Sequence, residues 1–249
     1  MDAAHVALVA GAALAAGAVN AIAGGGSLLT FPALVAAGLP TVAASVTNTV
    51  ALCPGYLGAT WAQRRELAGQ GPRLATLVPL SVVGGLAGGL LLLHTSESLF
   101  RSVVPFLILF AAVLLALQDV IRKRLFGRSH PGRSLLFAVV PVGLAAVYGG
   151  YFGAGVGVIM LGFLAIALDD NLIRLNALKQ ALSLACNIAA AVFFLTSGRI
   201  DWTVTAIMAG AALLGGLLGG ALVSRIPARA LRWIVVTFAV LVGVAYLVR

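Results

Sequence analysis

The sequence predicts an all-α polytopic membrane protein, from its hydrophobic composition, its long charge-free intervals and the similarity of its two halves. Of the 249 residues, 61% are hydrophobic and only 9% are charged, and the mean hydropathy is +1.11. Soluble domains are usually about a quarter charged, so the composition excludes that class. No segment alternates apolar and polar residues over roughly ten positions, as a transmembrane strand would.

The charge-free intervals outline the membrane spans. A spanning helix needs about 20 apolar residues, so the first and fourth intervals must each hold more than one helical segment. We expect eight to ten segments in total, some of them too short to cross the membrane alone. The intervals are 3–63, 74–96, 102–118, 134–168, 180–198, 202–224 and 233–248.

A basic segment divides the chain into two nearly equal halves. Sixteen Lys and Arg against seven Asp and Glu give a net charge of +9, and the densest basic cluster lies in 122–133. Cytoplasmic loops of membrane proteins are enriched in Lys and Arg, so loop topology explains the charge and no nucleic-acid partner is expected. We therefore predict an N-terminal membrane repeat at 1–121, a cytoplasmic linker at 122–133 and a C-terminal membrane repeat at 134–249.

Glycines indicate that the two halves are repeats. The pattern GGLAGG at 84–89 matches GGLLGG at 215–220 with an offset of 131 residues, and the same offset carries Gly24 to Gly155. These paired glycines are typical of close helix packing through small residues. Basic residues place corresponding loops on opposite sides of the membrane, which predicts inverted-topology repeats. A re-entrant segment counted as a span would instead make the repeats parallel.

Each repeat contains a glycine-rich break inside an apolar interval. In the first, Asn20 to Pro32 reads NAIAGGGSLLTFP. Unpaired backbone groups are not tolerated in hydrocarbon unless they pack inside protein or line a wet cavity, so a polar cavity is expected. Ser27 is expected to cap a half-helix over 28–37, whose N-terminus would attract anions. In the second repeat, 148–157 predicts another break and a half-helix that starts near Val158.

Polar residues follow each break and define the candidate site. Lys179 is an ionisable residue in a membrane helix, which makes it a functional-site candidate. Alternatively, it snorkels to the inner surface or pairs with Asp169 or Asp170, a role that suits Arg174 better. Hydroxyl groups of the first repeat could instead bond to their own helix. The predicted substrate-binding residues are Asn20, Gly25, Gly26, Ser27, Ser45, Thr47, Asn48, Gly153, Gly155, Asn176, Lys179 and Gln180.

The distribution of charge favours an anionic substrate, because all seven acids lie at span ends or in loops. A cation held by carbonyls and hydroxyls stays open as an alternative. An intramembrane serine protease would need a histidine near Ser27, but His5, His94 and His130 lie at span ends or in loops. We therefore expect a transporter, not an enzyme, with no catalytic residue, metal or cofactor. An anion channel or an importer of another small solute remains the alternative.

Two cysteines, Cys53 and Cys186, occupy nearly corresponding positions in the repeats. Buried cysteine usually acts as a small hydrophobic residue, and we expect that role here. Their spacing indicates no metal site.

Several of these motifs resemble a known family. The runs GGGSLLTFP, GLP and TNTVAL in the first half, and YGGYFGAGVG, RLNALK and SGRIDW in the second, are similar to the sulfite exporter TauE/SafE family of bacterial permeases. The resemblance covers nearly the whole chain and implies a multi-pass inner-membrane exporter of sulfite, sulfoacetate or related sulfur compounds. The chain departs from the family at Ser45, where an asparagine is often found.

Overall fold

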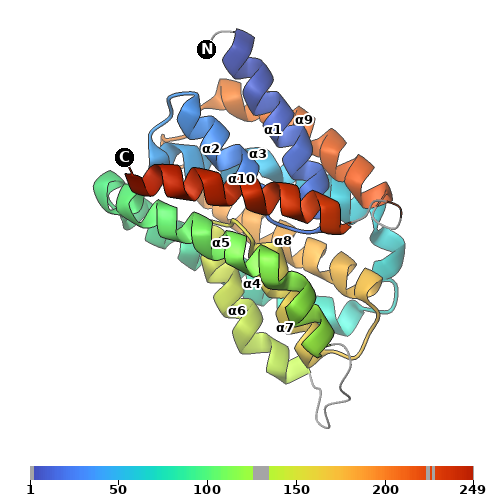
Figure 1. The fold of residues 1–249 in the computed structure, drawn as a ribbon. Coiled ribbons are helices and arrows are strands. Elements are labelled where there is room, and N and C mark those ends of the chain that lie inside the picture. Colours follow the sequence, from blue (N-terminus) through green and yellow to red (C-terminus); the bar gives the residue numbers. More distant parts are fainter. Residues whose placement is uncertain (1–2, 126–134, 223–224, 226–227, 249) are drawn as a thin grey trace.

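The computed structural model describes residues 3–125, 135–222, 225 and 228–248, and within these ranges the protein is helical (Figure 1). The predicted all-α class is confirmed. The predicted linker at 122–133, with His130, lies largely outside the described residues. The elements are α1 (Ala3–Ile22), α2 (Ser27–Ala36), α3 (Thr41–Ala62), the 3-10 helix η1 (Arg64–Leu67), α4 (Gly71–His94), α5 (Glu97–Leu125), α6 (Leu135–Tyr151), α7 (Val156–Ala167), α8 (Leu172–Phe194), α9 (Trp202–Ala221) and α10 (Ala228–Val248).

Six of the described helices, α1, α4, α5, α8, α9 and α10, are long and apolar enough to cross a membrane. The apolar helices α2, α6 and α7 are shorter. With its 10 residues, α2 is about 15 Å long, half the thickness of the hydrocarbon core. The predicted mixture of full spans and half-helices is therefore confirmed.

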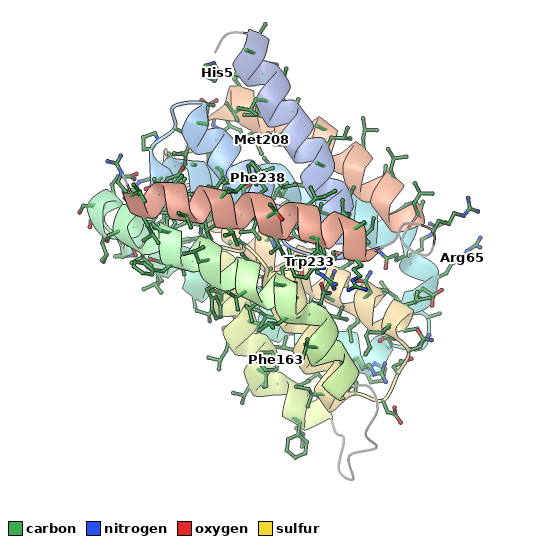
Figure 2. All side chains as sticks on the ribbon, in the orientation of Figure 1. His5, Arg65, Phe163, Met208, Trp233 and Phe238 are labelled. Atoms are coloured by element: carbon green, nitrogen blue, oxygen red, sulfur yellow. The ribbon has the colours of Figure 1, made fainter. Side chains whose placement is uncertain are left out.

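The side surfaces of the bundle suit a lipid environment. Figure 2 shows mostly carbon along the flanks of the helices, with the basic side chain of Arg65 projecting at one end. Large apolar side chains are exposed on several helices, including Phe137 on α6 and Leu241 on α10. Trp61 and Trp233 are also exposed, as is typical of aromatic residues at a membrane interface.

Both helix breaks use the same backbone pattern. At the end of α1, the amides of Ala23 and Gly24 both donate to Val19 O; at the end of α6, those of Phe152 and Gly153 both donate to Tyr148 O. The glycine that completes each pattern has a positive φ, 82° at Gly24 and 77° at Gly153. Side chains rarely adopt this left-handed conformation, so glycine at these positions ends each helix.

Two helices use their glycines to contact neighbours on both sides. On α4, Gly84 and Gly88 face α6, while Gly85 and Gly89 face α8. On α9, the pair 215 and 219 faces α1, and the pair 216 and 220 faces α3. A Cβ atom on Gly85 would lie 2.4 Å from the carbonyl oxygen of Cys186, which is closer than Cβ atoms come to other heavy atoms in proteins. The predicted packing role of the glycine pairs is confirmed.

The helices pack in a regular set of pairs around the centre. Helix α1 packs on α9 and α6 packs on α4, while α3 and α8 pack against each other in the middle. Helices α5 and α10 lie side by side across one face of the bundle (Figure 1). Aromatic rings fill part of the space beneath them: Phe31 of α2 meets Phe152 edge-on, with ring centroids 5.3 Å apart. This arrangement brings the two breaks together behind α5 and α10.

Candidate functional site at the two helix breaks

The two breaks are in direct contact. A Cβ atom on Gly24 would lie 3.2 Å from the amide nitrogen of Val158, and one on Gly157 would lie 3.4 Å from Gly24 Cα. The end of α1 therefore touches the first turn of α7. Gly24 has a φ of 82°, which favours glycine, and a Cβ atom there would be in tight contact with Val158 N, whereas one on Gly157 would make an ordinary van der Waals contact.

Asn20 connects the first break to α8. Its Oδ1 accepts a hydrogen bond from Gly26 N at 2.7 Å, and its backbone oxygen accepts from Lys179 Nζ at 3.2 Å and Gln180 Nε2 at 2.8 Å. The prediction that Ser27 caps the half-helix is wrong. Helix α2 starts at Ser27 after Gly26 and has no side-chain cap; the amides of Leu29 and Thr30, which a capping Ser27 would bind, donate to the carbonyl oxygen of Gly26.

Lys179 lies wholly inside the protein, with 1% of its surface exposed. The end of its aliphatic stem packs against Gly157, whose added Cβ would lie 3.4 Å from Lys179 Cδ. Its ammonium donates to a carbonyl at the C-terminal end of α1, the negative end of the helix dipole. Lys179 therefore neither snorkels to the surface nor pairs with Asp170.

Other amide side chains bind the remaining carbonyls of the break. Asn176 Nδ2 donates to Ala21 O at 3.1 Å and to Gln63 Oε1 at 2.8 Å. Gln118 Nε2 donates to Ala23 O at 3.4 Å. Sequence reasoning missed Gln63 and Gln118, because each sits beside charged residues at the edge of a charge-free interval and looks like an interfacial residue. We refer to Asn20, Asn176, Lys179 and Gln180 as the central polar cluster.

Several polar atoms here have no protein partner. Asn176 Oδ1, Gln180 Oε1, Gln118 Oε1 and Gln63 Nε2 are buried without a hydrogen bond among the described residues. A buried polar atom without a partner costs about 1–3 kcal/mol. These atoms and the remaining Lys179 protons are therefore available to a bound polar molecule or to water.

The predicted site residues of α3 are Ser45, Thr47 and Asn48, and none of them makes a hydrogen bond to the described residues of the central polar cluster. Thr47 Oγ1 accepts from Asp201 N at 3.1 Å, so its hydroxyl binds the start of α9. Thr49 Oγ1 donates to Ser45 O at 3.0 Å. This hydroxyl therefore bonds to its own helix, as the alternative interpretation predicted. Asn48 Oδ1 is buried and has no partner among the described residues.

The predicted glycines shape the two turns. Gly25 adopts φ 91° and packs beside Leu115 of α5. Gly155 is the left-handed residue before α7, with φ 75°, and packs against Ala111 of α5. Gly153 completes the end of α6. These three residues determine the course of the backbone at the breaks.

The site is closed in this conformation. Exposure is 4% for Asn20, 6% for Asn176, 1% for Lys179 and 0% for Gln180. The structure gathers polar side chains at the breaks, and the polar cavity expected there stays a prediction. A solute would reach it only after the surrounding helices move.

Comparison with known proteins identifies the family. The family model described as "Sulfite exporter TauE/SafE" matches residues 9–246, which is nearly the whole chain. The chain belongs to the TauE/SafE family. It is therefore a multi-pass membrane protein of a bacterial transporter family and not an enzyme.

Curated TauE/SafE relatives are described as transporters. "Probable membrane transporter protein YfcA" of Escherichia coli (strain K12) is 29% identical over 221 residues, covering 85% of this chain and 78% of the relative. A "Probable membrane transporter protein" of Haemophilus influenzae is 30% identical over 207 residues (82% and 80%). "Probable membrane transporter protein ORF9" of Sinorhizobium sp is 29% identical over 243 residues (96% and 89%). No solved structure matches the chain.

In this TauE/SafE protein, a charged network joins the α7–α8 turn to the start of α4. Arg174 Nε donates to both carboxylate oxygens of Asp170, at 3.0 and 3.1 Å, and Arg73 forms a further ion pair with Asp170. Arg174 thus takes the ion-pairing role considered for Lys179. Burial alone would raise the pKa of Asp170. The hydrogen bonds from Arg73, Arg174 and the Asn171 amide, with the charge of Arg174, lower the pKa below its ordinary value.

We expect Asp170→Asn to change how stability depends on pH. Because the pKa is lower in the folded than in the unfolded protein, the network stabilises the fold above the unfolded value of about 3.9 and loses this effect as the pH falls through the folded value. The melting temperature of the native protein should therefore fall more steeply between about pH 5 and pH 3 than that of Asp170→Asn. Glu66→Gln, outside this network, serves as the control; parallel curves for Asp170→Asn and the native protein would contradict the prediction.

Proposed function

We propose that this TauE/SafE protein transports a small anion, a sulfur oxyanion or organosulfonate such as sulfite or sulfoacetate, out of the cell across the bacterial inner membrane. The observation that carries the proposal is the buried ammonium of Lys179. Within the described part of the chain, Lys179 and Arg232 are the charged residues classed as buried, and both are cationic. Among the acids whose burial the structure describes, none is buried, and Lys179 forms no ion pair with any of them.

An anion at the central polar cluster would supply the counter-ion that Lys179 lacks. Burying a charge without a counter-ion is costly, and an oxyanion would neutralise Lys179 while accepting charge-assisted hydrogen bonds, which are the strong kind. Lys179 packs against the first turn of α7, where the helix dipole also favours negative charge. The unpartnered oxygens of Asn176 and Gln180 only accept hydrogen bonds, so the donors left for an oxyanion are the remaining Lys179 protons and the unpartnered Gln63 Nε2.

We further infer that the two halves are inverted repeats and that the substrate binds where they meet. The contact of α1 with α9 corresponds, under the 131-residue offset, to the contact of α6 with α4. Helices α3 and α8 correspond to each other and pack together, as do α5 and α10. Transporters built from inverted repeats often hold substrate among broken helices and alternate access by rocking one repeat against the other.

The membrane potential supports export. Moving one negative charge out of a cell with an interior about 100 mV negative releases roughly 2.3 kcal/mol. That free energy sustains roughly a fiftyfold concentration ratio. Export of a monovalent anion therefore needs no coupling ion.

A binding panel on purified protein tests the substrate class. We expect sulfite and sulfoacetate to raise the melting temperature more than sulfate, nitrite, thiosulfate or chloride at equal ionic strength. A ligand at 100 times its Kd stabilises the folded state by about 2.7 kcal/mol, which is readily measured. Equal shifts with chloride, or no shift with any sulfur anion, would contradict the proposal.

A further inference from the structure

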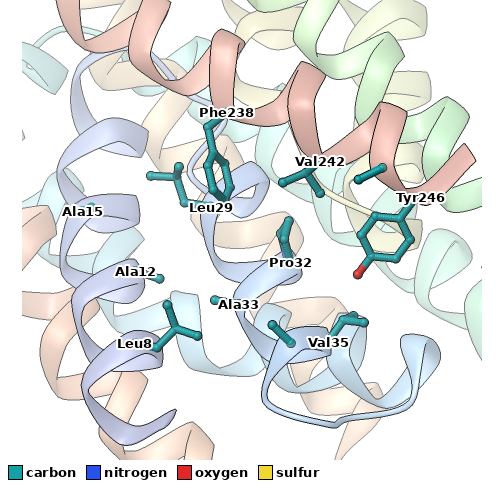
Figure 3. Close-up of a pocket in the computed structure, with 12 residues that line it drawn as sticks. Leu8, Ala12, Ala15, Leu29, Pro32, Ala33, Val35, Phe238, Val242 and Tyr246 are labelled. Atoms are coloured by element: carbon teal, nitrogen blue, oxygen red, sulfur yellow. The ribbon is translucent and has the colours of Figure 1, made fainter. Parts of the chain in front are cut away.

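A deep apolar groove opens on the side of the bundle between α1, α2 and α10 (Figure 3). Its volume is about 600 Å³. In Figure 3, Pro32 and Val35 of α2 face Val242 and Tyr246 of α10 across the groove. The groove exists because small residues line it where larger ones would close it: Ala12, Ala15, Ala33, Ala36 and Ala245.

The apolar groove adjoins a second cavity of different chemistry. This cavity has a volume of about 560 Å³ and shares Val35 and Tyr246 with the first. One turn of α5 contributes Ser98, Arg101 and Ser102 to its wall, which the helical repeat places on one face. The combined space is thus apolar at one end and cationic, with hydroxyl groups, at the other.

Arg101 is available to a ligand at the polar end. Its side chain is exposed, and it makes no hydrogen bond or ion pair with any residue that the structure describes. The nearest acid along the helix, Glu97, is occupied: its carboxylate accepts hydrogen bonds from the backbone amides of Thr41 and Val42 and from the Thr41 hydroxyl. A guanidinium can hold a phosphate through paired hydrogen bonds.

We propose that this composite groove is a binding site for an anionic membrane phospholipid. One acyl chain lies between α2 and α10, and the headgroup phosphate binds Arg101 where α3 and α5 begin and α10 ends. The site is apolar toward the middle of the bundle and has a cation near the helix ends. A phospholipid in one leaflet likewise has an apolar acyl chain toward the membrane centre and a phosphate near the surface. Lipid also has direct access, because Leu8 and Phe238 at the groove are 46% and 39% exposed on the lipid-facing surface.

The packing of the other half-helix supports a lipid as the missing neighbour of α2. Helix α7 packs directly on α5, where Ala111 lies against Gly155. Between α2 and α10 the corresponding space is the groove. An acyl chain there would support the half-helix α2, which follows the first break. The proposal of a lipid site does not depend on the proposed substrate.

Native mass spectrometry with phosphatidylglycerol as the probe tests this site. We expect Arg101→Gln to weaken retention of phosphatidylglycerol about fivefold. One Lys or Arg near an anionic lipid surface has an effect of about this size. Ala245→Leu, which narrows the apolar end, should weaken it as well. Matched controls are Arg199→Gln, an exposed arginine elsewhere, and Ala206→Leu, an exposed alanine on α9.

Three results would overturn the proposal. The first is equal loss of phosphatidylglycerol in Arg101→Gln and Arg199→Gln. The second is unchanged retention in Ala245→Leu, and the third is equal retention of phosphatidylcholine, whose headgroup has no net charge. Circular dichroism of each variant separates loss of the lipid from loss of the fold.

Discussion

Replacing Lys179 by alanine should lower anion flux in proteoliposomes by about ten- to a hundredfold. Hydrogen bonds to charged groups contribute about 1.5–3 kcal/mol, and each 1.4 kcal/mol corresponds to a factor of ten. The yield of folded protein should fall far less, because the substitution also removes a desolvated charge that has no carboxylate partner among the described residues. Efflux of sulfite from loaded vesicles measures the effect.

The controls for this experiment separate a binding role from a structural one. Lys179→Met keeps much of the side-chain volume without the charge, so its flux should match that of Lys179→Ala. Arg199→Ala removes an exposed cation away from the cluster and should leave flux unchanged. If Lys179→Ala transports at the native rate, Lys179 is not part of the substrate site.

Gly216→Ala should strongly destabilise the protein. Its Cβ would lie 2.0 Å from the carbonyl oxygen of Gly55, so α9 and α3 must separate along their whole contact. Overpacking of this kind costs about 1–3 kcal/mol even where side chains can move, and here the obstacle is backbone. The melting temperature in detergent should fall accordingly.

The same helix provides a matched control in Gly210, around which an added Cβ meets nothing within 4 Å. Gly210→Ala changes the chain by the same methyl group and should be neutral or stabilising by about 0.4–1 kcal/mol. Equal melting temperatures for the two variants would show that α9 does not depend on backbone contact with α3.

Local features of the sequence predicted much of the architecture. The glycine pairs and the 131-residue offset were informative, because close backbone contacts admit little besides glycine and leave a visible pattern. The breaks near Gly24 and Gly155 were predictable for the same reason. The buried Lys179 was conspicuous, since an ionisable residue in a helix expected to lie in the membrane needs a special environment.

Other parts of the site depend on contacts between distant segments. Ser27 is a residue type that often caps helices, yet it lies in the first turn of α2, and Asn20 of α1 binds the Gly26 amide that precedes this turn. Gln118 of α5 donates to Ala23 O, and Gln63, just after α3, accepts from Asn176 Nδ2. Nothing near either glutamine in the sequence indicates these contacts. Thr47 Oγ1 accepts a hydrogen bond from the Asp201 amide at the start of α9, a contact between segments 154 residues apart that the local sequence does not indicate.

Chemical rescue at position 179 tests the central claim most directly. In a Cys53→Ala, Cys186→Ala background, Lys179→Cys should transport poorly, and attachment of an aminoethyl group to the new thiol should restore anion flux. A methyl group attached in the same way should not. Full modification by mass spectrometry without recovery of flux, or equal recovery with the neutral group, would contradict an anion site built around the Lys179 ammonium.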